Sequence, residues 1–516
     1  MAGTKVSTHK VFQSVMEIAQ RRGFFWPAAR DLYSEAPAGF WIYGPLGIKM
    51  KNKIVQAWRN WILKPEGAYE IETPSLLPLA IFKASGHLEH FFDKLVECNQ
   101  CHTRWRADEL LEDKLNVRGI EGASEEELKE LLVKHEVRCP KCGAFNWSDV
   151  RRFNLMFLTA TGAEADEPNM GLRPETTQGS AVEFRRCYMV MRGKLPFIMA
   201  QLGHVFRNEI SPRRGLIRMR EFQQLEVHIF FDPENISPYD KKLEPYLGYK
   251  LRFLKLEDAD SGKIREIPAK EALESGYTIN ELITYWLVLY QRFFNEVLGF
   301  PLERLRYREL GPDERAHYAS AHWDLEVYSE EIGWVELVNN AYRTDYDLKG
   351  HSRESGVDLT VQTDGKKVLP HLYEPSIGLD RTIFFELLIS YRKDERVWMK
   401  LPRNLAPYDA AVFPLLSKED LIGKAREVEA LLSKDFEVFY DEKGSIGRRY
   451  RRMDEIGTPA CITIDYQTLE DDTVTLRDRD TMLQVRVGIE ELPKRLKEFL
   501  SGRRLEEIGE PLNQNQ

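Results

Sequence analysis

Residues 206–222 concentrate charge, because the sequence FRNEISPRRGLIRMREF carries five arginines and two glutamates. Guanidinium groups bind phosphate and carboxylate through paired hydrogen bonds, and carboxylates accept hydrogen bonds from an amine. An aromatic ring such as Phe222 can stack on a base. Together these residue types suit a nucleotide with an amine beside it. A solvated, charged hairpin is the simpler alternative.

The flanking segments GKLPFIMAQLGHV and LEVHIFF are apolar, and they predict a β-hairpin over residues 193–232 with SPRRGL as its connection. Every second side chain of a strand faces the same way, so Arg207 and Glu209 are expected to share one face. The return strand is expected to present Arg218, Arg220, Phe222, Gln224, Glu226 and His228 together. Charges in the middle of a sheet need partners, so the excess of arginine predicts an anionic ligand.

Two CxxC pairs form a second chemical pattern: Cys98 with Cys101, and Cys139 with Cys142. Two such pairs in an intracellular chain favour a metal over disulfides, and four thiolates would give a closed tetrahedral structural zinc site. Reduced cysteines without a metal are the alternative. The charged segment between the pairs is helical around SEEELKELLVKH and is expected to be an insertion in a small zinc module.

Composition limits the protein class. The chain has 516 residues, 43% hydrophobic and 30% charged, which predicts two to four domains. A net charge of −9 argues against a protein that coats a polyanion, but local basic patches can still face phosphate. The sequence has neither an N-terminal leader pattern nor an apolar run near the roughly 18 residues of a membrane span. We therefore expect a cytoplasmic protein without a membrane segment.

The order of elements predicts two large units. Helical spacing covers residues 46–63, a mixed segment spans 234–300, and GLDRTIFFELLISY predicts a buried helix that starts at a glycine. The proline-rich segment 401–409 is the expected domain boundary. Beyond it the order strand, helix, strand predicts an α/β domain of about 110 residues.

Several motifs resemble those of a known family. FRNE, a loop and RMREF resemble the second signature motif of class II aminoacyl-tRNA synthetases, and EPSIGLDR (374–381) resembles the third. The resemblance extends to glycyl-tRNA synthetases of the homodimeric archaeal and eukaryotic type. It is supported by GFWIYGPLGIKMKNKIVQAW, SGHLEHF, FNLMF, RPETTQG, GWVEL, GSIGRRYRRMDEIG and TLRDRDTM, which span nearly the whole chain in order.

The resemblance implies a fold and its domains. An α+β catalytic domain, the class II antiparallel sheet with flanking helices, would cover residues 1–402. It would contain a zinc-ribbon insertion at 95–150 and a mixed insertion at 234–300. An α/β anticodon-binding domain would cover residues 403–516. The helix at 46–63 and the strand that ends at Pro74 resemble the first class II motif, which makes the dimer contact.

The resemblance also implies roles for single residues. The residues implied for ATP are Arg207, Asn208, Glu209, Arg218, Phe222, Glu336, Leu337 and Arg381, with Arg207 and Arg381 catalytic. The residues implied for glycine are Glu175, Arg207, Glu226, Glu336, Glu374 and Ser376. Glu374 could alternatively be a Mg²⁺ ligand. Two places depart from the family pattern, His228 and the segment VNNAYR (338–343), and both bear on the shape of the glycine pocket.

The implied activity is that of a glycine–tRNA ligase, which uses ATP with Mg²⁺ to form glycyl-adenylate and passes glycine to the 3′ end of tRNA(Gly). The helix face with Arg448, Arg449, Arg451 and Arg452 would be a basic ridge for tRNA phosphates, with a solvated helix as the alternative. A class II synthetase for alanine or serine is one competing hypothesis. The other is a synthetase-like accessory subunit that binds nucleic acid and has lost its chemistry.

Overall fold

The computed structural model describes residues 9–115, 120–162, 167–210, 212, 214–312 and 314–512. Ser211 and Arg213, which belong to the expected hairpin connection, lie outside the described residues, as do residues 1–8. The described chain is built around a sheet of nine strands, in the order β13-β12-β14-β15-β16-β19-β11-β10-β3. Neighbouring strands are antiparallel, except that β12 pairs with β14 and β10 with β3 in parallel.

The strands at the centre of this sheet are long. They are β10 (Phe197–Phe206), β11 (Glu221–Phe231), β19 (His371–Gly378), β16 (Gly333–Thr344) and β15 (Ala321–Ser329). The outer strands are β14 (Leu305–Glu309), β12 (Lys250–Leu254), β13 (Arg265–Pro268) and β3 (Tyr69–Glu70). Since β12 and β13 extend the main sheet, residues 234–300 are not a separate module in space, and the insertion limits proposed for them stay a prediction.

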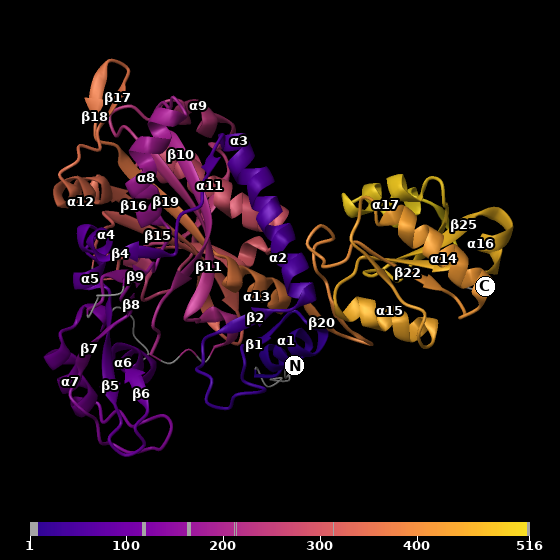
Figure 1. Ribbon diagram of the computed structural model, residues 1–516, viewed down its shortest axis with the longest axis horizontal. Helices are drawn as coiled ribbons and strands as arrows, with labels where there is room; N and C mark the ends of the chain where they lie inside the picture. The colour runs from indigo at the N-terminus through magenta and orange to yellow at the C-terminus, as the bar shows by residue number, and fades with distance from the viewer. Residues whose placement is uncertain are drawn as a thin grey trace.

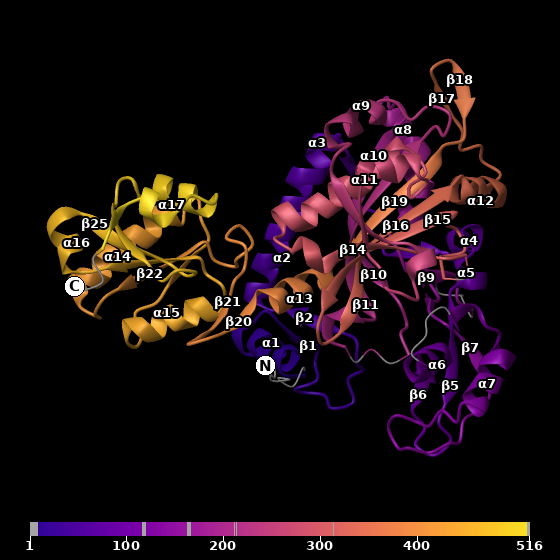
Figure 2. The ribbon, with the colours of Figure 1, turned by 180° about the vertical axis from the view of Figure 1, so that it is seen from behind.

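Helices cover both faces of the sheet (Figures 1 and 2). They include α2 (Pro45–Trp58), α8 (Thr177–Val190), α11 (Glu281–Arg292) and α13 (Leu379–Ser390). Helix α13 follows its N-cap Gly378 and is buried along almost its entire length, as the sequence predicts. The helical spacing at 46–63 is also confirmed, because α2 continues as a π-helix (Arg59–Leu63) and the next turn ends at Gly67 in the left-handed conformation.

The cysteine-rich module lies at one end of this sheet domain (Figure 1). Its strands β5 (Phe92–Glu97), β6 (Arg104–Arg106) and β7 (Arg151–Asn154) form a small sheet, and its helices are α6 (Ala107–Leu115) and α7 (Glu125–Lys134). The helix expected around SEEELKELLVKH is confirmed as α7, and Ser124 and Glu127 form a capping box at its start. Leu128 and Leu132 of α7 pack with Leu111 and Val96 into a core of their own.

The C-terminal domain lies at the opposite end of the molecule (Figures 1 and 2). Its sheet has the order β23-β22-β24-β25-β26-β27, and β22 (Ala410–Pro414), β23 (Val438–Tyr440) and β24 (Ala460–Ile464) are parallel. Helices α14 (Glu419–Leu432), α15 (Ile446–Glu455) and α17 (Leu492–Leu500) complete it. The ion pair between Lys53 and Asp409, 2.6 Å long, joins the two domains. The domain limits 1–402 and 403–516 stay predictions.

The hairpin prediction is confirmed for the strands and wrong for the arginines. β10 and β11 pair over their whole length, so Phe222, Gln224, Glu226 and His228 do share a face. However, β10 ends at Phe206 and β11 begins at Glu221. The connection between these strands, beyond their ends, therefore contains Arg207, Glu209, Arg218 and Arg220.

Cys187, outside the two CxxC pairs, lies in helix α8. Within the described residues, no helix has both the length and the apolar character needed to cross a bilayer.

Glu386 on α13 gives a test of the core. Its carboxyl group is buried, and within the described chain only one of its oxygens has a partner, the Ser390 hydroxyl at 3.3 Å. Burial raises the pKa of Glu386 to about 8. Its pKa in the unfolded chain is about 4.3, so between these values only the folded state holds the proton, and stability falls as pH rises.

We therefore predict that Glu386→Gln becomes progressively more stable than the wild type between pH 5 and pH 8, by at most about 1.4 kcal/mol per pH unit, and that the difference is constant above pH 8. Unfolding temperatures measured from pH 5 to 9 test this. Glu395→Gln, at an exposed position, serves as the control and should show no trend. Parallel pH curves for Glu386→Gln and the wild type would contradict the prediction.

Candidate active site

Hydrogen bonds between residues near its two ends hold the connection between β10 and β11 in place. The backbone N–H of Arg207 donates to the carbonyl of Arg220 at 2.9 Å, and the guanidinium of Arg220 donates to the carbonyl of Glu209 at 2.8 Å. The Arg218 Nε donates to the Glu209 carboxylate at 2.6 Å. Burial alone would lower the pKa of Arg218, but Glu209 and Glu109 raise it. The guanidinium groups of Arg218 and Arg220 thus both bind Glu209, one at its carboxylate and the other at its carbonyl.

Arg207 lies between two aromatic rings. Its guanidinium carbon is 5.4 Å from the ring centre of Phe222 and 5.4 Å from that of Phe91, and its Nε donates to the carbonyl of Pro174 at 3.2 Å. Phe91 directly precedes β5, so the root of the cysteine-rich module contributes to this site. The backbone N–H of Asn208 donates to the carbonyl of Leu155 at 2.8 Å, where the module returns to the main domain.

Arg381, in the first turn of α13, reaches the same region. Its Nε donates to the carbonyl of Ile217 at 3.0 Å, and its Nη1 forms an ion pair with Glu336 at 3.0 Å. Leu337, the neighbour of Glu336 on β16, is buried. The adjacent Asp380 accepts from Tyr43 at 2.5 Å and from the backbone N–H of Gln223 at 2.6 Å, which fixes α13 against β11.

A cluster of buried carboxylates lies farther along the same sheet face. Glu175, Glu374 and Asp347 surround the guanidinium of Arg343, which is 0% exposed. The N···O distances are 2.9, 2.6 and 2.7 Å, and the Tyr318 ring lies 3.5 Å from the guanidinium carbon. Burial alone would lower the pKa of Arg343, but the three carboxylates raise it well above its ordinary value.

Burial and this arginine act differently on the individual carboxyl groups. For Glu175, burial is opposed by Arg343 and His87, and the pKa falls well below its usual range. For Glu374, burial dominates over Arg343 and raises the pKa well above that range. Arg343 therefore keeps Glu175 ionised, whereas Glu374 tends to hold a proton.

Glu226 on β11 has a complete set of donors. One oxygen accepts from Ser376 at 3.0 Å, and the other accepts from the backbone N–H and the hydroxyl of Thr176 at 3.0 and 2.5 Å. His228 lies 3.2 Å from the same carboxylate and 3.0 Å from the Ser180 hydroxyl. Burial would raise the pKa of Glu226, but its hydrogen bonds, first that from His228, lower it.

The four cysteines of the CxxC pairs come together as expected. The sulfur of Cys98 is 3.6 Å from that of Cys142, and the sulfur of Cys101 is 3.7 Å from that of Cys139. All four sulfurs lie within 4.8 Å of one another. Glu226, His228 and Glu374 also meet this distance, but they belong to the buried pocket just described.

The expected basic ridge on α15 is partly wrong. Arg448 and Arg451 are exposed. Arg449 is 1% exposed and donates to the carbonyls of Pro414 and Leu415 at 2.5 and 3.1 Å, so it is a structural residue. Arg452 is held by the Asp441 carboxylate and the carbonyl of Lys443.

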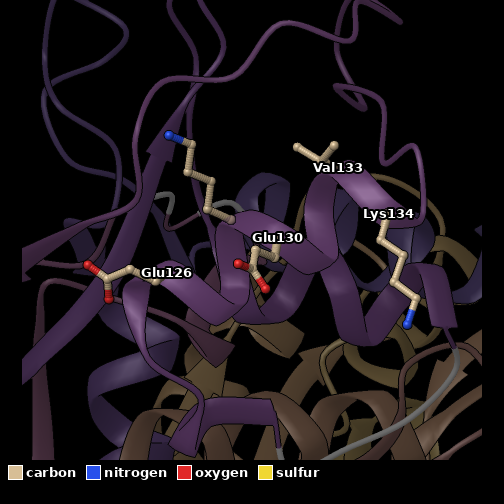
Figure 3. Close-up of a pocket in the computed structure, with 5 residues that line it drawn as sticks. Glu126, Glu130, Val133 and Lys134 are labelled. Carbon is tan, nitrogen blue, oxygen red and sulfur yellow. The ribbon is translucent and has the colours of Figure 1, made fainter.

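A hollow of about 480 Å³ lies on the outer side of α7, between Glu126, Lys129, Glu130, Val133 and Lys134 (Figure 3). Its lining consists of exposed side chains of one helix, with both signs of charge. None of the residues described above lines it, so this hollow is separate from the charged centre of the sheet.

The sequence reasoning missed three residues of the site. Arg343 lies in the segment 338–343, which was noticed only as a departure from a family pattern. Phe91 lies in SGHLEHF, and Glu109 in a segment expected to be only an insertion. Of these three residues, only Arg343 could have been inferred from the sequence. Several carboxylates expected to be buried together require a buried cation as their partner.

Comparisons with known proteins cover most of the chain. Residues 161–389 match the family of class II tRNA synthetase core domains (G, H, P, S and T). Residues 118–155 match the glycyl-tRNA synthetase insertion domain 1, and residues 409–499 match the anticodon-binding domain. A prolyl-tRNA synthetase structure from Cryptosporidium parvum aligns with 97% of this chain and 79% of its own, with a TM-score of 0.58 and 15% identity, and so supports the fold alone.

Relatives in the archaea are much more similar. The glycine–tRNA ligase of Pyrococcus furiosus is 41% identical, over 95% of this chain and 99% of its own. That of Thermococcus gammatolerans is 40% identical over 97% and 100%, and that of Methanocaldococcus jannaschii is 38% identical over 95% and 99%. The charged connection, the buried carboxylate cluster and the cysteine cluster thus occur in a chain that belongs, over nearly its full length, to the family of the glycine–tRNA ligases.

Proposed function

We propose that the protein joins glycine and ATP into glycyl-adenylate and then transfers glycine to the 3′ end of tRNA(Gly). In the first step a glycine carboxylate oxygen bonds to the α-phosphorus, the α–β phosphoanhydride bond breaks, and pyrophosphate leaves. No general base is required, because the attacking carboxylate is already ionised. The observation that carries the proposal is the arrangement of two groups along one face of the sheet. The arginines and Phe222 lie where β10 connects to β11, and the buried carboxylates lie farther along the same face.

The residues around the connection suit ATP. Arg207 would bind the α-phosphate and the glycine carboxylate, where a fixed guanidinium both aligns the reactants and stabilises the developing charge. Phe222 would stack on adenine, and Glu209 would accept from its amino group. Arg218 and Arg381 would bind the γ-phosphate. Glu209 and Glu336 neutralise these two arginines before a polyanion arrives.

Mg²⁺ prefers carboxylate oxygens, and Glu336, with 39% of its side chain exposed, fits such a ligand at the nucleotide side. When bound with ATP, the ion would neutralise phosphate charge. Glu374 fits this role poorly, because it is buried and holds Arg343. Its place supports the alternative role, a carboxyl group of the amine pocket.

The buried pocket suits the smallest amino acid. Glu175 and Glu226 supply ionised oxygens for an α-ammonium group, and Ser376 and Glu374 complete the wall. These side chains are held by Arg343, Thr176 and His228, so the wall cannot easily move away from a substrate methyl group. A rigid wall rejects alanine by overlap, whereas an open hydrophobic pocket gains only about 1 to 3 kcal/mol from a methylene.

The cysteine cluster suits a structural zinc ion. A tetrahedron with Zn–S bonds of about 2.3 Å has edges of about 3.8 Å. The sulfur distances of 3.6 and 3.7 Å fit these edges. Four thiolates fill the coordination sphere, so Cys98, Cys101, Cys139 and Cys142 would hold the module together without a catalytic position.

The C-terminal domain would bind the anticodon end of tRNA, with the exposed Arg448 and Arg451 as candidates for phosphate contacts. A homodimer through the segment that begins with α2, and a cytoplasmic location, stay predictions. The relatives named above are glycine–tRNA ligases, which argues against the alternative of a synthetase specific for alanine or serine. The accessory-subunit hypothesis is weaker, because Arg207, Glu209 and Arg381 are all present in the site.

The first test is pyrophosphate exchange with each of the twenty amino acids. We expect exchange with glycine only, and exchange with serine or alanine but not glycine would overturn the proposed substrate.

The same assay tests the role of Arg207. Arg207→Ala should reduce exchange by about two to three orders of magnitude, because it removes charge stabilisation at the α-phosphate. Circular dichroism should show an intact fold, and full activity would exclude Arg207 from the reaction.

The second test concerns the pocket. Arg343→Met leaves three carboxyl groups buried together without their cation, so we expect a loss of about 3 to 5 kcal/mol in the free energy of unfolding. Urea titration measures it. Arg186→Met removes an arginine of similar size that is exposed and pairs with Glu183 at 3.4 Å. This control should cost less than about 1 kcal/mol, and equal losses in the two variants would contradict the structural role of Arg343.

The third test concerns the metal. Purified protein should contain one zinc per chain by elemental analysis, and Cys139→Ser should lose it, because three thiolates leave the site incomplete. Cys187→Ser, on α8 and outside the cluster, should keep its zinc. Protease digestion should then cut the Cys139→Ser variant first within residues 95–150. Wild-type protein without zinc after metal-supplemented expression would refute the assignment.

A further inference from the structure

Arg218 is held from two sides by carboxylates of different parts of the chain. Glu209, in the same connection, accepts from its Nε at 2.6 Å. Glu109, on helix α6 of the cysteine-rich module, accepts from its Nη1 at 2.6 Å. These two residues are 100 positions apart in the sequence, so the module reaches across to the connection. The Nη2 group takes part in neither bond.

Glu109 is not an isolated surface carboxylate. Arg106, the last residue of β6 and three positions earlier in the sequence, lies 3.7 Å from it and also pairs with Asp93 at 3.3 Å and with Asp108. The side chains of Asp93 and Asp108 are 8% and 4% exposed, so Arg106 is anchored by two buried carboxylates. Glu109 itself is 45% exposed.

The two charged groups also influence each other electrostatically. Burial raises the pKa of Asp93 to about 6 against the effect of Arg106, and Glu209 and Arg218 also contribute, with opposite signs. Phe91, at the root of the module, contacts the guanidinium of Arg207. The module is therefore in contact with both of these arginines.

A carboxylate on an arginine can act in two ways when a phosphate arrives. It can compete with the phosphate for the guanidinium, or it can hold the guanidinium in place for it. Competition requires a carboxylate that leaves easily. Glu109 is restrained by Arg106, and the two carboxylates bind different nitrogens, so together they fix the plane of the guanidinium. Fixing the plane reduces the side-chain entropy lost when a ligand binds.

From this geometry we infer that Glu109 of the cysteine-rich module is a positioning residue for ATP, which acts by orienting Arg218 toward the terminal phosphates. The inference rests on the proposed function, because it takes Arg218 as a phosphate-binding residue. It gives the module a part in nucleotide binding beyond its own stability.

The test compares Glu109→Gln and Glu109→Ala with the wild type in glycine-dependent pyrophosphate exchange. We expect the KM for ATP to rise about threefold to tenfold for Glu109→Ala, with kcat nearly unchanged, because the lost contact is a partly exposed ion pair. Glu109→Gln keeps a hydrogen-bond acceptor and should lie between the two. Asp113→Asn removes one negative charge from an exposed position of the same helix and should leave the KM unchanged.

A second measurement separates orientation of Arg218 from general damage. The affinity for a non-hydrolysable glycyl-adenylate analogue, which lacks the β- and γ-phosphates, should be the same in the Glu109 variants and the wild type. A lower KM for ATP in Glu109→Ala would show competition and overturn the inference, as would an unchanged KM or an equal loss of analogue affinity. If the wild type exchanges pyrophosphate with another amino acid, the proposed function fails, but the comparison can be made with that substrate.

Discussion

The buried guanidinium of Arg343 is the constraint on which the acidic pocket depends. Carboxylates so close together repel one another and lose their hydration, so without a cation most of them would be protonated or driven apart. Arg343 binds Glu175, Glu374 and Asp347 at once, and its own side chain has no exposed surface. The cluster can therefore present the ionised oxygens of Glu175 and Glu226, which come from different segments of the chain. Their hydrogen bonds and ion pairs hold these carboxylates in place.

The nucleotide side is constructed differently. Its arginines lie in a connection and at a helix start, and they are at least partly exposed, with carboxylates and backbone carbonyls as partners. Partly exposed ion pairs are weak, so the arginines can adjust to a polyanion at low cost while their carboxylate partners keep them oriented. The same sheet therefore carries a rigid, buried site for the small substrate and a more adaptable, partly exposed site for the large one.

Local patterns in the sequence were sufficient for much of this arrangement. The strands around the charged connection, the helix after Gly378 and the capped helix α7 all follow from alternation, helical spacing and capping residues. The four cysteines were identified by spacing, because few other patterns place four thiolates together. The error over Arg207 and Arg218 arose where the strand pattern was extended past its ends, since nothing local marks residue 206 as the last of β10.

What could not be predicted depends on contacts between distant segments. Arg449 belongs to the same charged run as Arg448, yet only the packing of α15 against β22 decides which of them is buried. The placement of Glu109 beside Arg218 has the same origin, because it requires the module to fold and to dock on the main domain. A contact over 100 residues is maintained only if the module is rigid, and its small core contains few buried side chains. In the proposed function, zinc bound by the cysteine cluster would supply this rigidity, and the chemistry of the cysteines and that of the arginines would then be connected through the module.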